Sequence, residues 1–234
     1  MKAEWRVGLR SRRLFFLNTV IPLAFVAPII LSNAPPVHVT AILVVLFALF
    51  STFGSSIPLI RDQESGLLQR YVMTGLNPGR LVLERTVGFV AIDFLQLIPA
   101  MLLIIFTYSS TLGSTLLFVV AVLLSLLAGN LVGVLAATIA RSIAEGALFS
   151  SGIALYLVHL AGVFRVASGG SFWATLELWI PFRPLYIAVR GIVTGIGPTD
   201  TMGLMALPIV ATVGLVLVTY LRGQMLSISK KMNG

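Results

Sequence analysis

The chain has 234 residues, of which 58% are hydrophobic and only 10% are charged. A soluble domain of this length carries roughly 25% charged residues, so the composition predicts an integral membrane protein without a sizeable soluble domain. The net charge of +8 does not indicate nucleic-acid binding, because the basic residues lie at the ends of apolar segments, where they face lipid headgroups. The sequence has no cysteine, which excludes disulfides and thiolate chemistry.

Six apolar segments are long enough to cross the hydrocarbon core, which needs about 20 residues. They predict one transmembrane domain over residues 1–234, an all-α fold with six membrane-spanning helices. The predicted spans are 14–32, 37–60, 86–108, 115–140, 146–164 and 201–221. The first segment also has the basic front of a signal peptide, but it leads directly into the second segment, which favours a retained span.

Residues 1–13 precede the first span and mix apolar with basic side chains. Trp5, Val7 and Leu9 stand among Arg6 and Arg10, which predicts an interfacial helix that lies on the membrane. A basic topology anchor without helical structure is the alternative interpretation of the same residues.

The distribution of Lys and Arg predicts the orientation. With the N-terminus inside, only Arg165, Arg183 and Arg190 of the 16 basic residues lie outside, and the other 13 lie on the cytoplasmic side. This bias follows the positive-inside rule. We therefore expect a multi-pass protein of the plasma or inner membrane with both termini in the cytoplasm.

The polar segment 61–85 between the second and third spans carries seven charged residues. We expect a short helix that begins at residues 64–66, with Leu67, Leu68, Tyr71 and Val72 on one face. The Asn-Pro-Gly run at residues 77–79 predicts the turn that ends it. A cytoplasmic helix held between two spans is a docking site for a soluble partner; the alternative is a helix that simply lies on the headgroups.

Few polar side chains lie inside the predicted spans. Asp93 is about 12 Å past Arg85 along a helix, and Gln96, one turn further, is placed to share its hydrogen bonds. Such a carboxylate serves either as a proton or cation relay or as a structural hydrogen-bond partner, and we expect the structural role. The same two interpretations apply to His159 in the fifth span. Small-residue motifs, Gly129 with Gly133 and 191 with 195, predict close helix packing.

The outer segment 166–200 is too apolar for a solvated loop, yet Pro181 and Pro184 interrupt it too often for a span. We expect two short helices that dip into the outer leaflet beside the sixth span, meeting near residues 181–184. Trp179 and Tyr186 suit a membrane interface. The alternative is a hairpin that lies on the interface and only seals the outer face.

Sequence motifs of common enzymes are missing. There is no P-loop and no H-E-x-x-H motif, and His38 and His159 are too few for a histidine-rich metal site, so we expect no metal. Ser150 and Ser151 share a predicted helix with His159 but lie about 12–13 Å from it along the axis, too far for a catalytic hydrogen bond. We therefore do not expect this chain to be an enzyme.

These features together resemble the permease subunits of ABC exporters of the second type, the class that exports drugs, polysaccharides and lipids. The family's cytoplasmic signature is an acidic start with glycine, an apolar coupling helix, a turn and a charged re-entry. It is matched here by Asp62, Glu64, Gly66, Leu67, Leu68, the turn 75–78 and Glu84–Arg85. The segment Pro181–Tyr186 through Arg190 resembles the family's proline-bearing outer hairpin. Two departures are Tyr71–Met73, where the family more often has leucines, and the late proline after Gly75.

The resemblance implies a permease subunit that exports a hydrophobic or amphipathic substrate, such as a drug, a lipid or a glycan. A second permease subunit, identical or paralogous, would pair with it among the membrane lipids. A cytoplasmic ABC ATPase would bind ATP and Mg²⁺, with no cofactor in this chain. The residues implied in coupling are Asp62, Glu64, Gly66, Leu67, Leu68, Gln69, Arg70 and Tyr71. Those implied in an outer gate are Trp179, Pro181, Arg183, Pro184, Tyr186 and Arg190.

Two other functions compete with this one. A proton-coupled secondary transporter would use Asp93, but such carriers usually show internal repeats, and residues 1–113 do not match residues 114–234 convincingly. A membrane scaffold or assembly subunit is the non-transport alternative.

Overall fold

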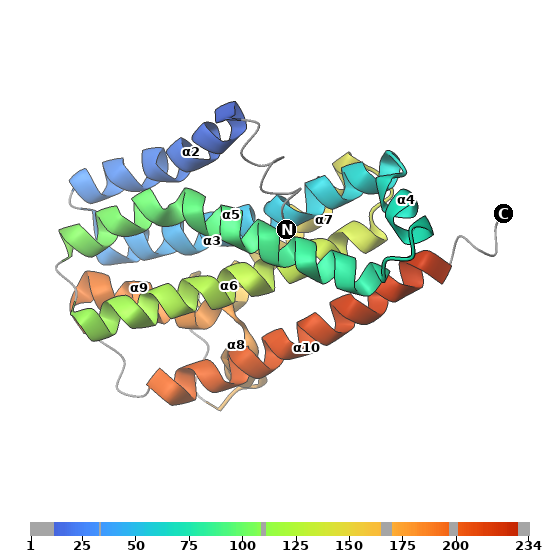
Figure 1. Cartoon of the computed structure of the whole chain (residues 1–234). Coiled ribbons are helices and arrows are strands. Elements are labelled where there is room, and N and C mark those ends of the chain that lie inside the picture. The colour runs from blue at the N-terminus through green and yellow to red at the C-terminus, as the bar shows by residue number, and fades with distance from the viewer. Residues whose placement is uncertain (1–11, 33, 109–110, 165–169, 197–200, 229–234) are drawn as a thin grey trace.

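The computed structural model describes residues 12–32, 34–108, 111–164, 170–196 and 201–228, and every regular element in these ranges is a helix. The long helices run roughly along one direction, and α4 lies at one end of the bundle (Figure 1). The helices are α2 (Arg12–Leu31), α3 (Pro36–Glu64), α4 (Leu67–Met73), α5 (Pro78–Thr107), α6 (Leu112–Ile139), α7 (Ile143–Leu160), α8 (Phe172–Trp179), α9 (Phe182–Thr194) and α10 (Thr201–Ile228). Residues 1–11 of the predicted interfacial helix lie outside the described ranges.

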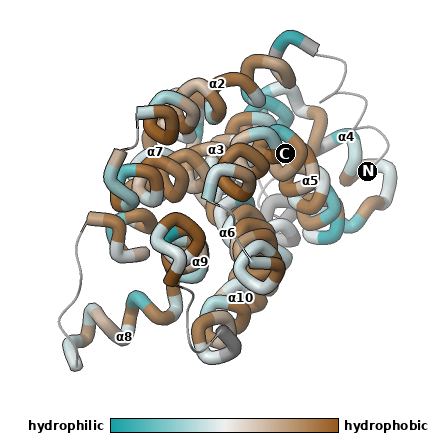
Figure 2. The backbone as a smooth tube through the Cα atoms, turned by 90° about the vertical axis from the view of Figure 1, so that its left-hand side faces the viewer, coloured by the Kyte–Doolittle hydropathy of each residue, from teal (hydrophilic) through white to brown (hydrophobic). Residues whose placement is uncertain are grey.

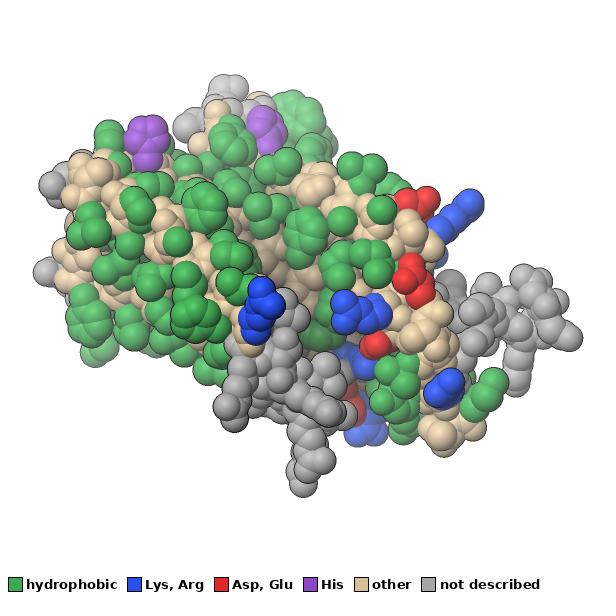
Figure 3. Space-filling model, turned by 90° about the horizontal axis from the view of Figure 1, so that it is seen from above, with side chains coloured by type: hydrophobic (Ala, Val, Ile, Leu, Met, Phe, Trp, Pro, Cys, Tyr) green, Lys and Arg blue, Asp and Glu red, His purple; other side chains and the backbone are tan. Residues whose placement is uncertain are grey.

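Five of the described helices, α3, α5, α6, α7 and α10, are long and apolar enough to cross a membrane. The apolar part of α2, Phe15–Leu31, spans only about 25 Å, slightly less than the hydrocarbon core of about 30 Å. Hydrophobic side chains cover most of the face in Figure 3, and the acidic side chains gather toward the α4 end. The chain is a multi-pass membrane protein, and the sixth span stays a prediction.

Local capping residues make α5 and α7 begin earlier than predicted. Asn77 caps α5 by accepting a hydrogen bond from the Arg80 N–H at 3.1 Å, so α5 starts at Pro78 instead of residue 86. The fifth predicted span also begins earlier than residue 146, because the Ser142 hydroxyl accepts a hydrogen bond from the Glu145 N–H at 3.2 Å and α7 starts at Ile143. Glu145 Oε2 accepts from the Arg141 N–H in return, an arrangement close to a capping box that was readable from the sequence.

The short helix predicted to begin at residues 64–66 is α4, and Gly66 is the residue that caps its start. Glu64 is the last residue of α3, and α4 starts at Leu67. Gly66 separates the two helices with a φ of 69°, a left-handed conformation that favours glycine and ends helices.

The centre of the bundle is α3, which packs most extensively on α6 and α7. Gly129 and Gly133 of α6 face α3: a Cβ at Gly133 would lie 2.2 Å from the carbonyl oxygen of Thr52, so the two helices touch at their backbones. The Ser55 hydroxyl donates to the Asn130 carbonyl oxygen at 2.7 Å across the same contact. The close packing predicted for this motif is confirmed. Gly195, by contrast, ends α9 with a φ of 73°, and a Cβ there would meet nothing within 4 Å.

The outer segment forms two short helices, α8 and α9, as predicted, and they are separated at Ile180–Pro181. Figure 2, a view along the bundle, places α8 at its margin. The expected position beside the last span holds for α8, which packs on α10, whereas α9 packs mainly on α6 and α3. The reason is that most of α9, including Leu185, Val189 and Ile192, is buried apolar surface that a single neighbouring helix could not cover.

Candidate functional site

The connection at the α4 end is fixed by backbone hydrogen bonds at its sharp corner. Ser65 N–H donates to the Arg61 carbonyl oxygen at 2.9 Å, and Gly66 N–H donates to that of Gln63 at 3.1 Å. These bonds satisfy carbonyls that the end of α3 would otherwise leave open. The start of α4 is therefore rigidly oriented relative to α3.

An ion pair joins α3 to α5 next to this corner. Arg85 donates from Nη1 to Asp62 Oδ2, and the two side chains are 12% and 18% exposed. The Arg85 guanidinium also lies 5.8 Å from the centre of the Tyr71 ring, a cation–π distance. One arginine thus contacts side chains of both α3 and α4 from its place on α5.

The two sides of α4 differ. Leu68 packs inward on the buried cluster formed by Leu59, Ile60, Val82, Val134 and Ala137. Met73 at the end of α4 is 84% exposed, and Leu76 beyond it is 48% exposed. Leu68 therefore anchors α4 to the bundle. Met73 of α4, together with Leu76 three residues beyond it, exposes an apolar side chain.

Of the other residues implied in coupling, Glu64 and Arg70 are exposed, and Leu67 and Tyr71 are half-buried. The Gln69 side chain lies outside the described parts of the structure. Sequence reasoning missed Met73 and Leu76, because seven helical residues carry too little periodicity to show which apolar face turns away from the bundle.

A second polar region lies inside the bundle. Asp93 of α5 is 5% exposed, and its Oδ2 accepts a hydrogen bond from Asn130 Nδ2 of α6 at 2.8 Å. Asn130 also donates to the Leu126 carbonyl oxygen at 2.9 Å, which fixes its amide. Among the described residues, Gln96 makes no hydrogen bond to Asp93, so the expected sharing is wrong. Asn130, which lies 37 positions further along the chain, takes this role, and a sequence pattern cannot show such a contact.

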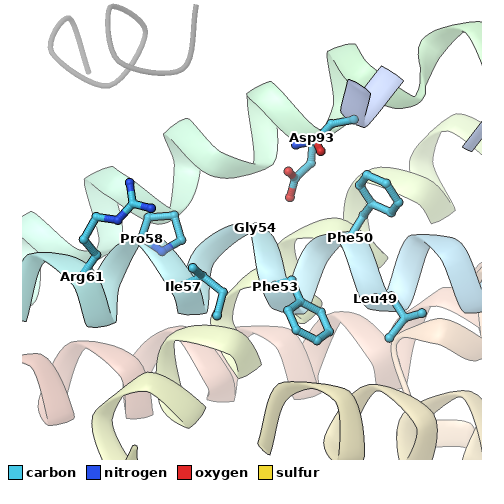
Figure 4. Close-up of a pocket in the computed structure, with 9 residues that line it drawn as sticks. Leu49, Phe50, Phe53, Gly54, Ile57, Pro58, Arg61 and Asp93 are labelled. Atoms are coloured by element: carbon cyan, nitrogen blue, oxygen red, sulfur yellow. The ribbon is translucent and has the colours of Figure 1, made fainter. Parts of the chain in front are cut away.

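A pocket of about 460 Å³ opens beside Asp93. Figure 4 shows the Asp93 side chain pointing from α5 toward Gly54 on α3, with Phe50 and Arg61 further along α3 on either side. A Cβ at Gly54 would lie 2.8 Å from both carboxylate oxygens, so the glycine makes room for the carboxylate. His159 lies elsewhere, half-buried in α7; Ser150 of that helix donates to the Ser56 hydroxyl at 2.8 Å.

A family model described as ABC-2 type transporter matches residues 1–194, which is most of the chain. The chain belongs to the ABC-2 type transporter family. The match covers everything from the N-terminus to the end of α9, including the α4 connection and the outer hairpin. No curated protein matches the chain. The family is that of permease components whose ATPase is a separate subunit.

The outer hairpin of this permease meets α6 near its middle. The Ser125 hydroxyl donates to the Pro181 carbonyl oxygen at 2.9 Å, and a Cβ at Gly129 would lie 3.1 Å from the Phe182 ring. Ser125 is about 20 Å along α6 from its first residue. The apex of the hairpin is therefore deep in the bundle instead of at the level of the helix ends.

An ion pair closes this apex. Arg183 donates from Nη1 to Glu177 Oε2, and the Glu177 side chain is 3% exposed. Of the residues implied in an outer gate, Pro181 and Pro184 are buried, Arg183 and Tyr186 are half-buried, and Trp179 and Arg190 are exposed. Sequence reasoning passed over Glu177, because its partner lies across a helix break and the two follow no helical spacing.

Proposed function

We propose that this permease is the membrane-spanning subunit of an ATP-driven exporter, with a separate cytoplasmic ABC ATPase docked on α4. ATP and Mg²⁺ would bind to that partner, and a second permease subunit would complete the path for a hydrophobic or amphipathic substrate. The family membership supports the transporter class. The observation that carries the coupling role is the exposed Met73 on a short helix that is tied to two long ones.

The outer hairpin fits the role of a gate in this proposal. Its apex lies against α6 and α3, which also form the contact around Gly129 and Gly133. A movement of α3 driven from α4 would therefore reach the hairpin directly, since α3 runs from one region to the other.

Replacing Met73 with Asp tests the docking surface. The tagged permease, purified from its native membranes, should bring down a P-loop ATPase and hydrolyse ATP, and the Met73→Asp variant should lose both while its membrane insertion stays normal. Leu112→Asp is the matched control. Leu112 is equally exposed, at 86%, but it is the first residue of α6 and does not belong to the α4 connection. An ATPase that remains bound to the Met73 variant would rule out this docking surface. If the wild type brings down no ATPase, the exporter proposal fails as a whole.

The orientation has its own test. Reporters inserted near Gly75 and fused after Gly234 should both be cytoplasmic, and one inserted near residue 169 should be external. An external reporter at Gly75 would place α4 out of reach of any cytoplasmic ATPase.

A further inference from the structure

The pocket beside Asp93 combines one buried carboxylate with largely apolar walls. Its volume of about 460 Å³ lies in the range of drug-sized ligand sites. Phe50, Phe53 and Ile57 of α3 contribute the wall, and Asn18 reaches it from α2. The site therefore lies between α2, α3 and α5, away from the hairpin and from the α4 surface.

The protein offers little to compensate a negative charge on Asp93. Within the described residues, its only hydrogen bond comes from Asn130, and the ion pairs there join other residues. An ionised carboxylate at this depth is costly, because the bilayer offers no water to solvate it. A ligand that brings a positive charge to the carboxylate supplies what the fold lacks.

The space around the carboxylate is kept open for such a ligand. Glycine at position 54 lets the carboxylate rest against α3, and any side chain there would collide with it. In Figure 4 the Phe50 ring lies on the same side of α3 as Asp93. An aromatic face beside a carboxylate is a common arrangement for binding organic cations.

We propose that this pocket binds a lipophilic monocation, an organic cation with an apolar body, whose charge lies against the Asp93 carboxylate. The positive charge of Arg61 restricts the cation to the Asp93 end, since Arg61 is two helical turns from Gly54, about 10 Å along α3. The apolar body fills the space along Phe53 and Ile57. Binding does not require the ATPase; the use of this pocket as a loading site for export rests on the proposed function.

Tetraphenylphosphonium is a suitable probe, and tetraphenylborate is its control, because the two ions share a shape and differ in charge. Their binding is measured by equilibrium dialysis on the full-length permease in lipid nanodiscs, without ATPase, after subtraction of empty nanodiscs. In Asp93→Asn the affinity for the phosphonium should fall roughly tenfold or more, because the buried opposite charge is gone. The affinity for the borate should not fall. An equal loss of both ions would overturn the proposal, as it indicates a collapsed pocket.

A second variant tests the same site without replacing Asp93. Gly54→Ala pushes a methyl group against the carboxylate and should also weaken phosphonium binding. Gly152→Ala is the control, because a Cβ on that α7 glycine meets nothing within 4 Å, and it should bind like the wild type. Unchanged phosphonium affinity in both Asp93→Asn and Gly54→Ala overturns the proposal. Loss of binding without any change in ATPase co-purification separates this inference from the exporter proposal.

Discussion

The α4 corner and the apex of the outer hairpin share one feature: two helices meet at a break, and an arginine–carboxylate pair lies beside it. The pairs are Asp62 with Arg85 and Glu177 with Arg183. Their surroundings differ. The α4 corner lies where the charged side chains of Figure 3 gather, whereas the hairpin apex lies against the middle of an apolar helix.

The surroundings of the two ion pairs determine how much each pair contributes to stability. The two carboxylates differ in burial: the Asp62 side chain is 18% exposed, whereas that of Glu177 is 3% exposed. A carboxylate that loses its arginine is costly in proportion to its burial, because water solvates an accessible charge and not an enclosed one. Opening the pair at the α4 corner therefore costs less than opening the pair at the hairpin apex.

The strongest test of this comparison is Arg183→Leu. It leaves the Glu177 carboxylate buried without the guanidinium, and we expect the permease to lose about 3–5 kcal/mol of stability. Thermal unfolding in detergent measures the loss. The double variant with Glu177→Gln should recover much of it, because no buried charge then remains. A single variant as stable as the wild type would show that the apex is hydrated.

Phe182→Ala tests the apolar part of the apex. Phe182 is fully buried, and its ring approaches Gly129. We expect a loss of about 2 kcal/mol, less than in a soluble core, because an unpacked phenylalanine in lipid remains in an apolar medium and only the cavity is costly. Met73→Ala at the α4 end is the comparison, and it should leave unfolding unchanged. Equal effects of the two variants would contradict the distinction between the regions.

The positions of the long helices could be predicted from the sequence, but the contacts between those helices could not. Long apolar runs determine where α3, α5 and α6 lie, and Asn77 and Ser142 mark helix starts that follow from capping rules. Contacts between distant residues leave no such pattern. Asp93 was recognisable as a buried carboxylate, but nothing local connected it to Asn130.

Sequence analysis also could not show in which direction the side chains of a short helix point. Leu68 and Met73 are both apolar residues of a short helix, and only the packing of α4 on α3 shows that the first faces inward and the second outward. The outer prolines predicted a break between two helices but not the depth that the contact between Ser125 and Pro181 reveals.

Arg85→Met should have a smaller effect on stability than Arg183→Leu. The variant keeps an apolar stem against Tyr71 and removes the pair with Asp62. We expect a loss of about 1–2 kcal/mol, because the Asp62 carboxylate that remains is 18% exposed, against 3% for Glu177. Its main effect should be on coupling, with ATP hydrolysis less stimulated by substrate in the assembled transporter. A loss of stability as large as that of Arg183→Leu would mean that the α4 corner is as dry as the apex.

The smallest effect is expected for Arg80→Ala, which removes a pair of the same chemistry with full access to water. Arg80 Nε donates to Glu84 Oε1 at 2.8 Å one turn along α5, and the side chains are 78% and 45% exposed. Such pairs on a helix surface contribute about 0.3–0.5 kcal/mol, and salt screens them. Unfolding of wild type and variant should therefore converge as the salt concentration rises, whereas the difference for Arg183→Leu should persist. A salt-independent loss in Arg80→Ala would mean that Arg80 contacts more than Glu84, and the ranking of the three pairs by the exposure of their carboxylates would fail.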